Sequence, residues 1–181
     1  MTAPIIHGGR LRGTRLAVAE GRVTRPTRSR VREALFSMLQ TRLEGARVLD
    51  LYAGSGALGL EALSRGAAHA TFVERDPRAL ACLRSNLAAC RLQPDQHALL
   101  VTDAQAFEPA GAVFDLALLD PPFALRDPIA PSLRRAGTLA ADGLLVIEQP
   151  SERVAPVRAG ALALHESRPY GTSSLWIYAP A

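Results

Sequence analysis

The sequence predicts an α/β fold in which helices cover a mainly parallel sheet. Short apolar runs alternate with segments whose apolar residues recur at helical spacing, and this alternation is typical of βαβ units. A glycine-rich turn, Gly54-Ser55-Gly56, follows the first long run, and acidic residues end the runs that come next. These observations favour a doubly wound domain with its ligand site at the carboxyl ends of the strands.

The elements can be assigned in order along the chain. Strands are expected at 47–51, 70–74, 98–102, 113–119, 144–148, 161–165 and 174–178. The last two have a short connection, which suits an antiparallel hairpin at the edge of the sheet. Helices are expected at 57–66, from Asp76-Pro77 onward and near 128–139, with a break before Asp142-Gly143. Helices should cover both faces of the sheet.

The N-terminal residues 1–24 are expected to form a small β extension ahead of the main domain, residues 25–181. Ile5-Ile6-His7 and Thr14–Val18 are candidate strands around a turn at Gly8-Gly9. Their apolar content is too small to fold alone, so the extension should pack on the main domain. A helix then begins near 25–29, with Thr27 or Ser29 as its N-cap.

Composition indicates one globular cytosolic domain. Hydrophobic residues make up 48% and charged residues 21% of the 181 positions, an ordinary globular balance. No apolar run reaches membrane-spanning length, and the N-terminus shows no signal-peptide pattern. Cys82 and Cys90 are expected to be buried thiols, and the scattered histidines predict no metal site.

Positive charge is concentrated at the N-terminus. All 21 basic residues are arginines, and residues 1–32 contain eight of them against Glu20, a net charge of +7. A GC-rich coding bias would account for the use of arginine throughout the chain. It would not account for the concentration of arginines at the N-terminus. We therefore favour contact with nucleic-acid phosphates. The candidates are Arg10, Arg12, Arg15, Arg25, Arg28, Arg30 and Arg32.

The glycine turn and the acids after the strands predict a nucleoside pocket. Gly54-x-Gly56-x-x-Gly59 matches the dinucleotide fingerprint, a weak signal by itself. Asp50, Glu74 and Asp103 strengthen it, because each ends a predicted strand at the same edge of the sheet. The plain structural alternative is an α/β domain whose strand ends are merely polar.

The fourth strand of the predicted sheet runs into Asp120-Pro121-Pro122-Phe123. Consecutive prolines fix φ and hold the neighbouring acceptors outward. Such a turn can offer acceptors to an exocyclic amino group and an aromatic face to a planar base. A rigid strand-to-helix turn with Phe123 in the core is the alternative.

These motifs resemble those of the amino methyltransferases that use S-adenosylmethionine, whose signature is Asp/Asn-Pro-Pro-aromatic. The block Ile5-Ile6-x-Gly8-Gly9-x-x-Arg12-Gly13, the segment Arg25-Pro26-Thr27-x-x-Arg30-Val31-Arg32-Glu33 and the tail Tyr170-Gly171-x-x-x-Leu175-x-x-Tyr178 are similar to the RsmD family. The family usually has a Thr-Asp pair or similar where this chain has Arg28-Ser29. The resemblance implies a Rossmann-like class I methyltransferase fold with a seven-stranded sheet. It also implies methylation of guanine N2 in small-subunit (16S) ribosomal RNA.

The resemblance further implies roles for individual residues. Asp120 and the Pro121 carbonyl would accept hydrogen bonds from the amino group, and Phe123 would stack on the base. Asp120 either takes the proton or only orients the amine. Arg30 and Arg32 would contact the cofactor carboxylate or RNA phosphate. The expected S-adenosylmethionine-binding residues are Asp50, Ala53, Gly54, Ser55 and Gly56 around the methionine part, Glu74 and Arg75 at the ribose, Asp103 and Ala104 at the adenine, and Asp120.

The expected partner is small-subunit ribosomal RNA, within an assembling or assembled 30S particle, and the expected state is a monomer. The nearest alternative is a DNA amino methyltransferase acting on adenine or cytosine, because the Asp-Pro-Pro-aromatic motif also serves those bases. The glycine motif alone also suits an NAD-dependent dehydrogenase. A non-catalytic RNA-binding assembly factor is the alternative outside the enzymes.

Overall fold

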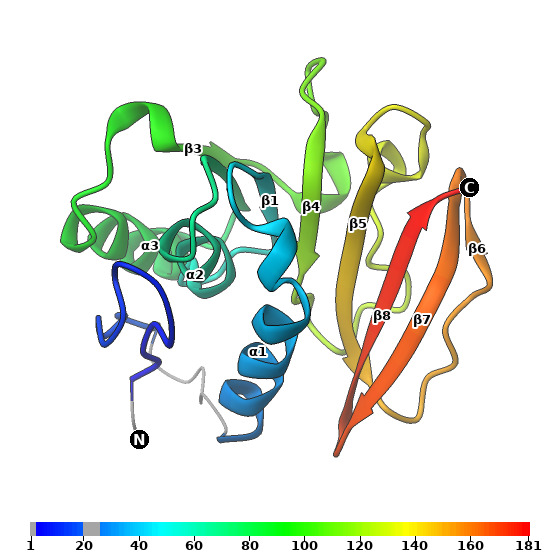
Figure 1. The fold of residues 1–181 in the computed structure, drawn as a ribbon, viewed down its shortest axis with the longest axis horizontal. Helices are drawn as coiled ribbons and strands as arrows, with labels where there is room; N and C mark the ends of the chain where they lie inside the picture. Colours follow the sequence, from blue (N-terminus) through cyan, green and yellow to red (C-terminus); the bar gives the residue numbers. More distant parts are fainter. Residues whose placement is uncertain (1–2, 20–25) are drawn as a thin grey trace.

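A computed structural model describes residues 3–19 and 26–181 (Figure 1). The α-helices are α1 (Pro26–Met38), α2 (Ala57–Ser64) and α3 (Pro77–Ala89). The strands are β1 (Arg47–Leu51), β2 (His69–Glu74), β3 (His97–Val101), β4 (Phe114–Leu119), β5 (Leu139–Pro150), β6 (Arg158–Ala159), β7 (Leu162–Tyr170) and β8 (Ser173–Pro180). Short 3-10 turns are η1 (Gln40–Arg42), η2 (Pro94–Gln96), η3 (Ala104–Ala106) and η4 (Pro131–Arg134). None of the helices within these ranges has both the length and the apolar character needed to cross a bilayer.

All strands join one sheet in the order β3-β2-β1-β4-β5-β8-β7-β6. The first five are parallel to one another, and β8 is antiparallel to both β5 and β7. The expected terminal hairpin is therefore confirmed, with β8 on its inner side. The sheet has one strand more than the seven expected, because the two-residue β6 pairs with β7 at the edge.

The sheet register brings the carboxyl ends of the central strands together. Leu51, the last residue of β1, pairs with Val73 of β2 on one side and with Leu119 of β4 on the other. The chain passes from β1 through β2 to β3 on one side of the sheet, and it continues from β4 to β5 on the other side. The connections after β1 and after β4 therefore lead in opposite directions. A crevice for ligands forms at such a switch point in open α/β sheets.

Helices were expected on both faces of the sheet, and this expectation is wrong for the described chain. Buried side chains of α1, α2 and α3 share one core cluster, which includes Leu35, Leu60 and Leu83. The other face is covered by loops and the short turns η3 and η4, whose buried residues include Ala104 and Leu133. The three α-helices thus lie on the face that also receives the N-terminal segment (Figure 1).

The helix expected near 128–139 is reduced to the four-residue turn η4. Pro131 suits the first turn of a helix, but the chain is already extended at Arg135, with φ −87° and ψ 144°, and Gly137 follows with a left-handed φ of 83°. The strand β5 then starts at Leu139, ahead of the break expected before Asp142-Gly143. The register with β4 shifts by three residues there, since Phe114 pairs with Leu139 and Leu116 with Leu144.

The N-terminal segment packs on the main domain, as expected, but it does not form two strands. Ile5 and Arg15 make one isolated antiparallel bridge around a loop. Ile6 and Leu16 are each 1% exposed and belong to the core beneath the three helices. The helix α1 begins at Pro26, so Thr27 lies inside the helix and the N-cap expectation is wrong.

Candidate functional site

The glycine turn between β1 and α2 requires its glycines. Gly54 and Gly56 have φ angles of 57° and 82°, in the left-handed region that side chains rarely adopt. A Cβ on Gly56 would lie 2.4 Å from Leu83 Cδ1, and one on Gly59 would lie 2.3 Å from Phe72 Cε1. The backbone here is therefore packed tightly against α3 and β2.

Asp50 sits beneath this turn and is 1% exposed. Its Oδ2 accepts a hydrogen bond from the N–H of Gly59 at 2.8 Å. Burial raises the pKa of Asp50 to about 8, and the charges of Asp120 and Glu74 act in the same direction. Three carboxyl groups thus influence one another at this edge of the sheet, and a positively charged ligand group would be stabilised there.

Glu74 holds the glycine turn from the neighbouring strand. Its Oε2 accepts from the N–H of Gly54 at 2.8 Å, while Oε1 accepts from the N–H groups of Arg75 and Asp76. Asp76 in turn caps α3 through its side chain. The carboxylate of Glu74 is therefore fixed in place with 8% of its surface exposed.

Asp103 begins a chain of polar contacts that reaches the loop after β4. Its carboxylate pairs with Arg75 Nη1 and accepts from the N–H of Gln105 at 2.9 Å. The Gln105 side chain donates to the Tyr52 hydroxyl at 2.5 Å, and that hydroxyl donates to the Pro128 carbonyl at 2.9 Å. Ala104 is buried beside this chain. Tyr52, which sequence reasoning missed, thus joins the glycine turn to the loop carrying Asp120-Pro121-Pro122-Phe123.

The Asp120–Phe123 motif follows β4 directly and turns back at once. The N–H of Leu125 donates to the Pro122 carbonyl at 2.9 Å, which closes a tight turn. Pro121 is buried, Pro122 is exposed and Phe123 is half-buried. The four residues therefore lie at the same edge as Asp50 and Glu74, as the sequence predicted.

Arg32 reaches toward this edge from α1. Its side chain is 11% exposed, its Nη2 donates to the Ile5 carbonyl at 2.7 Å, and its Nε lies 3.9 Å from Glu61 Oε2. Burial lowers the pKa of Arg32, while the negative charges of Glu61, Glu33 and Asp120 oppose that shift. This burial leaves little surface for an RNA phosphate.

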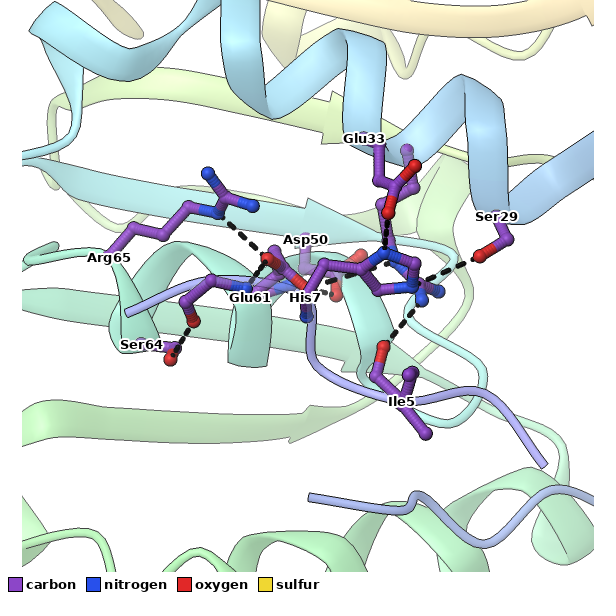
Figure 2. A network of polar contacts seen from close by, with 11 residues as sticks. Ile5, His7, Ser29, Glu33, Asp50, Glu61, Ser64 and Arg65 are labelled. Atoms are coloured by element: carbon purple, nitrogen blue, oxygen red, sulfur yellow. Dashed lines mark hydrogen bonds and ion pairs between the residues drawn. The ribbon is translucent and has the colours of Figure 1, made fainter. Parts of the chain in front are cut away.

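Glu61 organises the docking of the N-terminal segment, and sequence reasoning missed it (Figure 2). Its carboxylate is 1% exposed and accepts from the N–H groups of His7 and Gly8 and from Arg65 Nε. Ser64 Oγ donates to the Gly8 carbonyl at 2.5 Å. An acid within the otherwise apolar stretch of α2 was the available signal, because a buried charge requires partners.

The helix α1 holds the same segment from the other side. His7 contacts Glu33 through Nδ1 and Ser29 through Nε2, as Figure 2 shows.

The helix α3 holds the segment farther along. Asn86 of α3 binds both the N–H and the carbonyl of Ala17, and it also donates to the Ser55 carbonyl at 2.9 Å. The segment therefore ends against the glycine turn.

The predicted phosphate-contacting arginines fall into two groups. Arg10, Arg12, Arg15 and Arg30 are exposed, and Arg10 also donates to Gln96 Oε1 at 3.2 Å. Arg25 and the side chain of Arg28 lie outside the described residues. In the part of the chain that the structure describes, no group of three or more His, Cys, Asp or Glu is placed to hold a metal ion.

Comparisons with known proteins cover nearly the whole chain. The family model described as conserved hypothetical protein 95 matches residues 5–179. The chain is 36% identical over 176 residues to ribosomal RNA small subunit methyltransferase D of Escherichia coli (strain K12), covering 96% of this chain and 88% of that protein. Of the solved structures, the putative methyltransferase yhhF of Escherichia coli is 35% identical with a TM-score of 0.84, over 98% of this chain and 97% of that one. A hypothetical protein of Thermus thermophilus is 32% identical with a TM-score of 0.81, over 99% of this chain and 100% of that one.

Proposed function

Because the chain belongs to the RsmD family, we propose that it methylates the exocyclic N2 amino group of a guanine in small-subunit ribosomal RNA, with S-adenosylmethionine as methyl donor. The observation that carries the proposal is the placement of Asp120-Pro121-Pro122-Phe123 beside the glycine turn at the switch point between β1 and β4. A cofactor site and an amino-group site meet there.

The residues at this edge suit S-adenosylmethionine, which supplies an electrophilic methyl group when bound. The left-handed glycines let a ligand approach the backbone of residues 53–56 closely. A cationic group of the ligand, its ammonium or sulfonium, would favour the ionised form of the buried Asp50 carboxyl when it binds beside it. Glu74 and Arg75 would face the ribose, and Asp103 with Ala104 the adenine.

The target amine is a weak nucleophile, because its lone pair is delocalised into the guanine ring. Asp120 and the carbonyl of Pro121 would accept its hydrogen bonds and so orient that lone pair toward the methyl group. The ring of Phe123 would stack on the base. Asp120 would then either take the proton or only orient the amine.

A guanine reaches this edge only when it is unpaired or turned out of its helix. The exposed arginines of the N-terminal segment would supply affinity for the RNA backbone, with little base selectivity. We further propose that the RNA is presented within a small-subunit particle and that the protein acts as a monomer.

Methyl transfer from radiolabelled S-adenosylmethionine tests the proposal. Unmodified small ribosomal subunits, free ribosomal RNA and duplex DNA would be offered to the wild type, to Asp120→Ala and to the control Asp142→Ala, which removes an exposed carboxylate. We expect N2-methylguanine in the subunit or the RNA. The Asp120→Ala rate should fall by about 100-fold or more, the scale expected for proton-transfer and orienting groups. Asp142→Ala should match the wild type.

The other outcomes favour the alternatives. Label in DNA alone would favour an amino methyltransferase of DNA. Cofactor binding without transfer to any substrate, unchanged by Asp120→Ala, would favour an RNA-binding assembly factor. Quenching of Trp176 fluorescence by NAD would favour a dehydrogenase that uses the glycine motif.

A further inference from the structure

One arginine side chain holds the backbone of the loop that presents Phe123. Arg153 lies in the turn after β5, which its own N–H closes by donating to the Pro150 carbonyl at 3.0 Å. Its Nη2 donates to the carbonyl of Phe123, and its Nη1 donates to the carbonyl of Leu125 at 2.8 Å. The turn after β5 and the turn after β4 are thus joined by one guanidinium, about 30 residues apart in sequence.

The guanidinium is itself anchored to the sheet. Arg153 Nη1 also donates to Gln149 Oε1 at 2.7 Å. Gln149 is 0% exposed at the end of β5, and its own amide donates to the Glu148 carbonyl at 2.9 Å. The guanidinium of Arg153 therefore has a fixed orientation. Rotation of the side chain would break its hydrogen bonds to Gln149 and to the carbonyls of the loop.

Arg153 supports the start of the loop, whereas the Tyr52 hydroxyl holds its far end at the Pro128 carbonyl. Its two prolines lack backbone N–H groups, so the loop has few donors with which to hold itself. The internal bond from Leu125 to the Pro122 carbonyl closes the turn but does not fix the turn relative to the sheet. The contacts of Arg153 with the carbonyls of Phe123 and Leu125 supply that fixation from β5.

We propose that Arg153 is a positioning residue for methyl transfer, which sets the place of the Phe123 ring and of the Asp120 acceptor through the loop backbone. The inference rests on the proposed function, in which that ring stacks on the target guanine. Methyl transfer requires nitrogen, methyl and sulfur in line, so a displacement of the base by about 1 Å costs about 100-fold in rate.

Kinetics of Arg153→Met and Arg153→Lys test the proposal, with Arg158→Met on the edge strand β6 as the matched control. We expect kcat to fall by about tenfold to 100-fold in Arg153→Met and by less in Arg153→Lys, which keeps a cationic donor but loses the planar fork. The Kd for S-adenosylmethionine, measured by calorimetry, should stay within about twofold, since Arg153 acts on the loop that presents the base. Equal kcat values for Arg153→Met and Arg158→Met would overturn the proposal, as would a loss of cofactor affinity by the same factor as kcat.

Hydrogen exchange separates this proposal from the proposed function. The amides of residues 123–127 should exchange faster in Arg153→Met than in the wild type or Arg158→Met, whether or not a substrate is known. If the wild type transferred no methyl group to RNA, the proposed function would fail while this comparison still decided the role of Arg153. Equal exchange rates for residues 123–127 in Arg153→Met and the wild type would overturn the positioning role of Arg153.

Discussion

The carboxyl group of Asp50 is enclosed at the end of β1, where burial favours its neutral form. The raised pKa of about 8 means that the folded protein keeps this proton at neutral pH, whereas the unfolded chain releases it near the ordinary value of 3.8. Between these two values the folded state binds more protons than the unfolded state. Stability from this group is therefore fully present below about pH 4 and is lost as the pH rises toward 8.

Asp50→Asn should remove this pH dependence. Asparagine keeps an acceptor for the Gly59 N–H but has no proton to lose. The stability of the variant relative to the wild type should rise between about pH 5 and pH 7, by up to about 1.4 kcal/mol for each pH unit. Urea unfolding at several pH values measures the difference. If the free energies of unfolding of the two proteins changed with pH in parallel in that window, Asp50 would be ionised in the folded state. Asp142→Asn provides the control, because the Asp142 carboxylate is exposed.

At the scale of elements, the N-terminal segment is attached to the helices through buried polar groups. Glu61 and Ser64 of α2 bind its backbone near Gly8, and Asn86 of α3 binds it at Ala17. Ile6 and Leu16 add apolar contacts in the shared core. The segment is thus part of the domain surface beside the glycine turn.

Glu61→Ala should release that segment. The change leaves the half-buried N–H groups of His7 and Gly8 and the guanidinium of Arg65 without their acceptor. Breaking a buried charge pair in this way costs about 3–5 kcal/mol. Trypsin should then cut faster after the segment's arginines, and denaturant unfolding should report the loss.

Glu61→Gln is the graded control for this prediction, since an amide oxygen can replace one acceptor position. Glu166→Ala is the surface control, because Glu166 pairs with Arg168 on the surface of β7. Cleavage rates alike in Glu61→Ala and Glu166→Ala would mean that Glu61 does not hold the segment.

Local patterns predicted the elements that carry the site. The apolar run of β1, the glycines after it and the acids at the strand ends are signals within a few residues, and parallel strands must bring such ends together. The position of Asp120-Pro121-Pro122-Phe123 beside the glycine turn followed from the same reasoning.

Contacts between distant segments were not predictable in this way. Glu61 meets His7 and Gly8 across more than 50 residues, and Arg153 meets Phe123 across 30. Their partners are backbone groups, which carry no sequence signal. The helix expected near 128–139 is cut to one short turn, because the chain becomes extended at Arg135.

For the whole molecule, charge is distributed unevenly around a domain of net charge +4. Arg10, Arg12 and Arg15 are exposed on a segment that Ser64 holds against the body through the N–H of Leu11. Farther along, Ala17 of that segment is bound by Asn86, which also binds Ser55 of the glycine turn. The segment thus runs from the amino ends of the strands, where Arg10 binds Gln96 just before β3, toward the glycine turn near Ala17. Its exposed arginines suit the backbone of an RNA that extends past the candidate site.

Replacing Arg10, Arg12 and Arg15 together by glutamine should lower the affinity for RNA. It should also make that affinity less dependent on salt concentration. Each lost phosphate contact lowers the slope of log K against log salt by about 0.7–0.9, so three contacts would lower it by about 2–3. Cofactor affinity should not change, because these side chains are exposed on the N-terminal segment. The matched control replaces the exposed Arg47, Arg135 and Arg158 by glutamine, which removes the same charge from other parts of the surface. Equal slopes for the two triple variants would mean that net charge alone attracts the RNA, whereas a lower slope only for the N-terminal variant would place the RNA backbone along that segment.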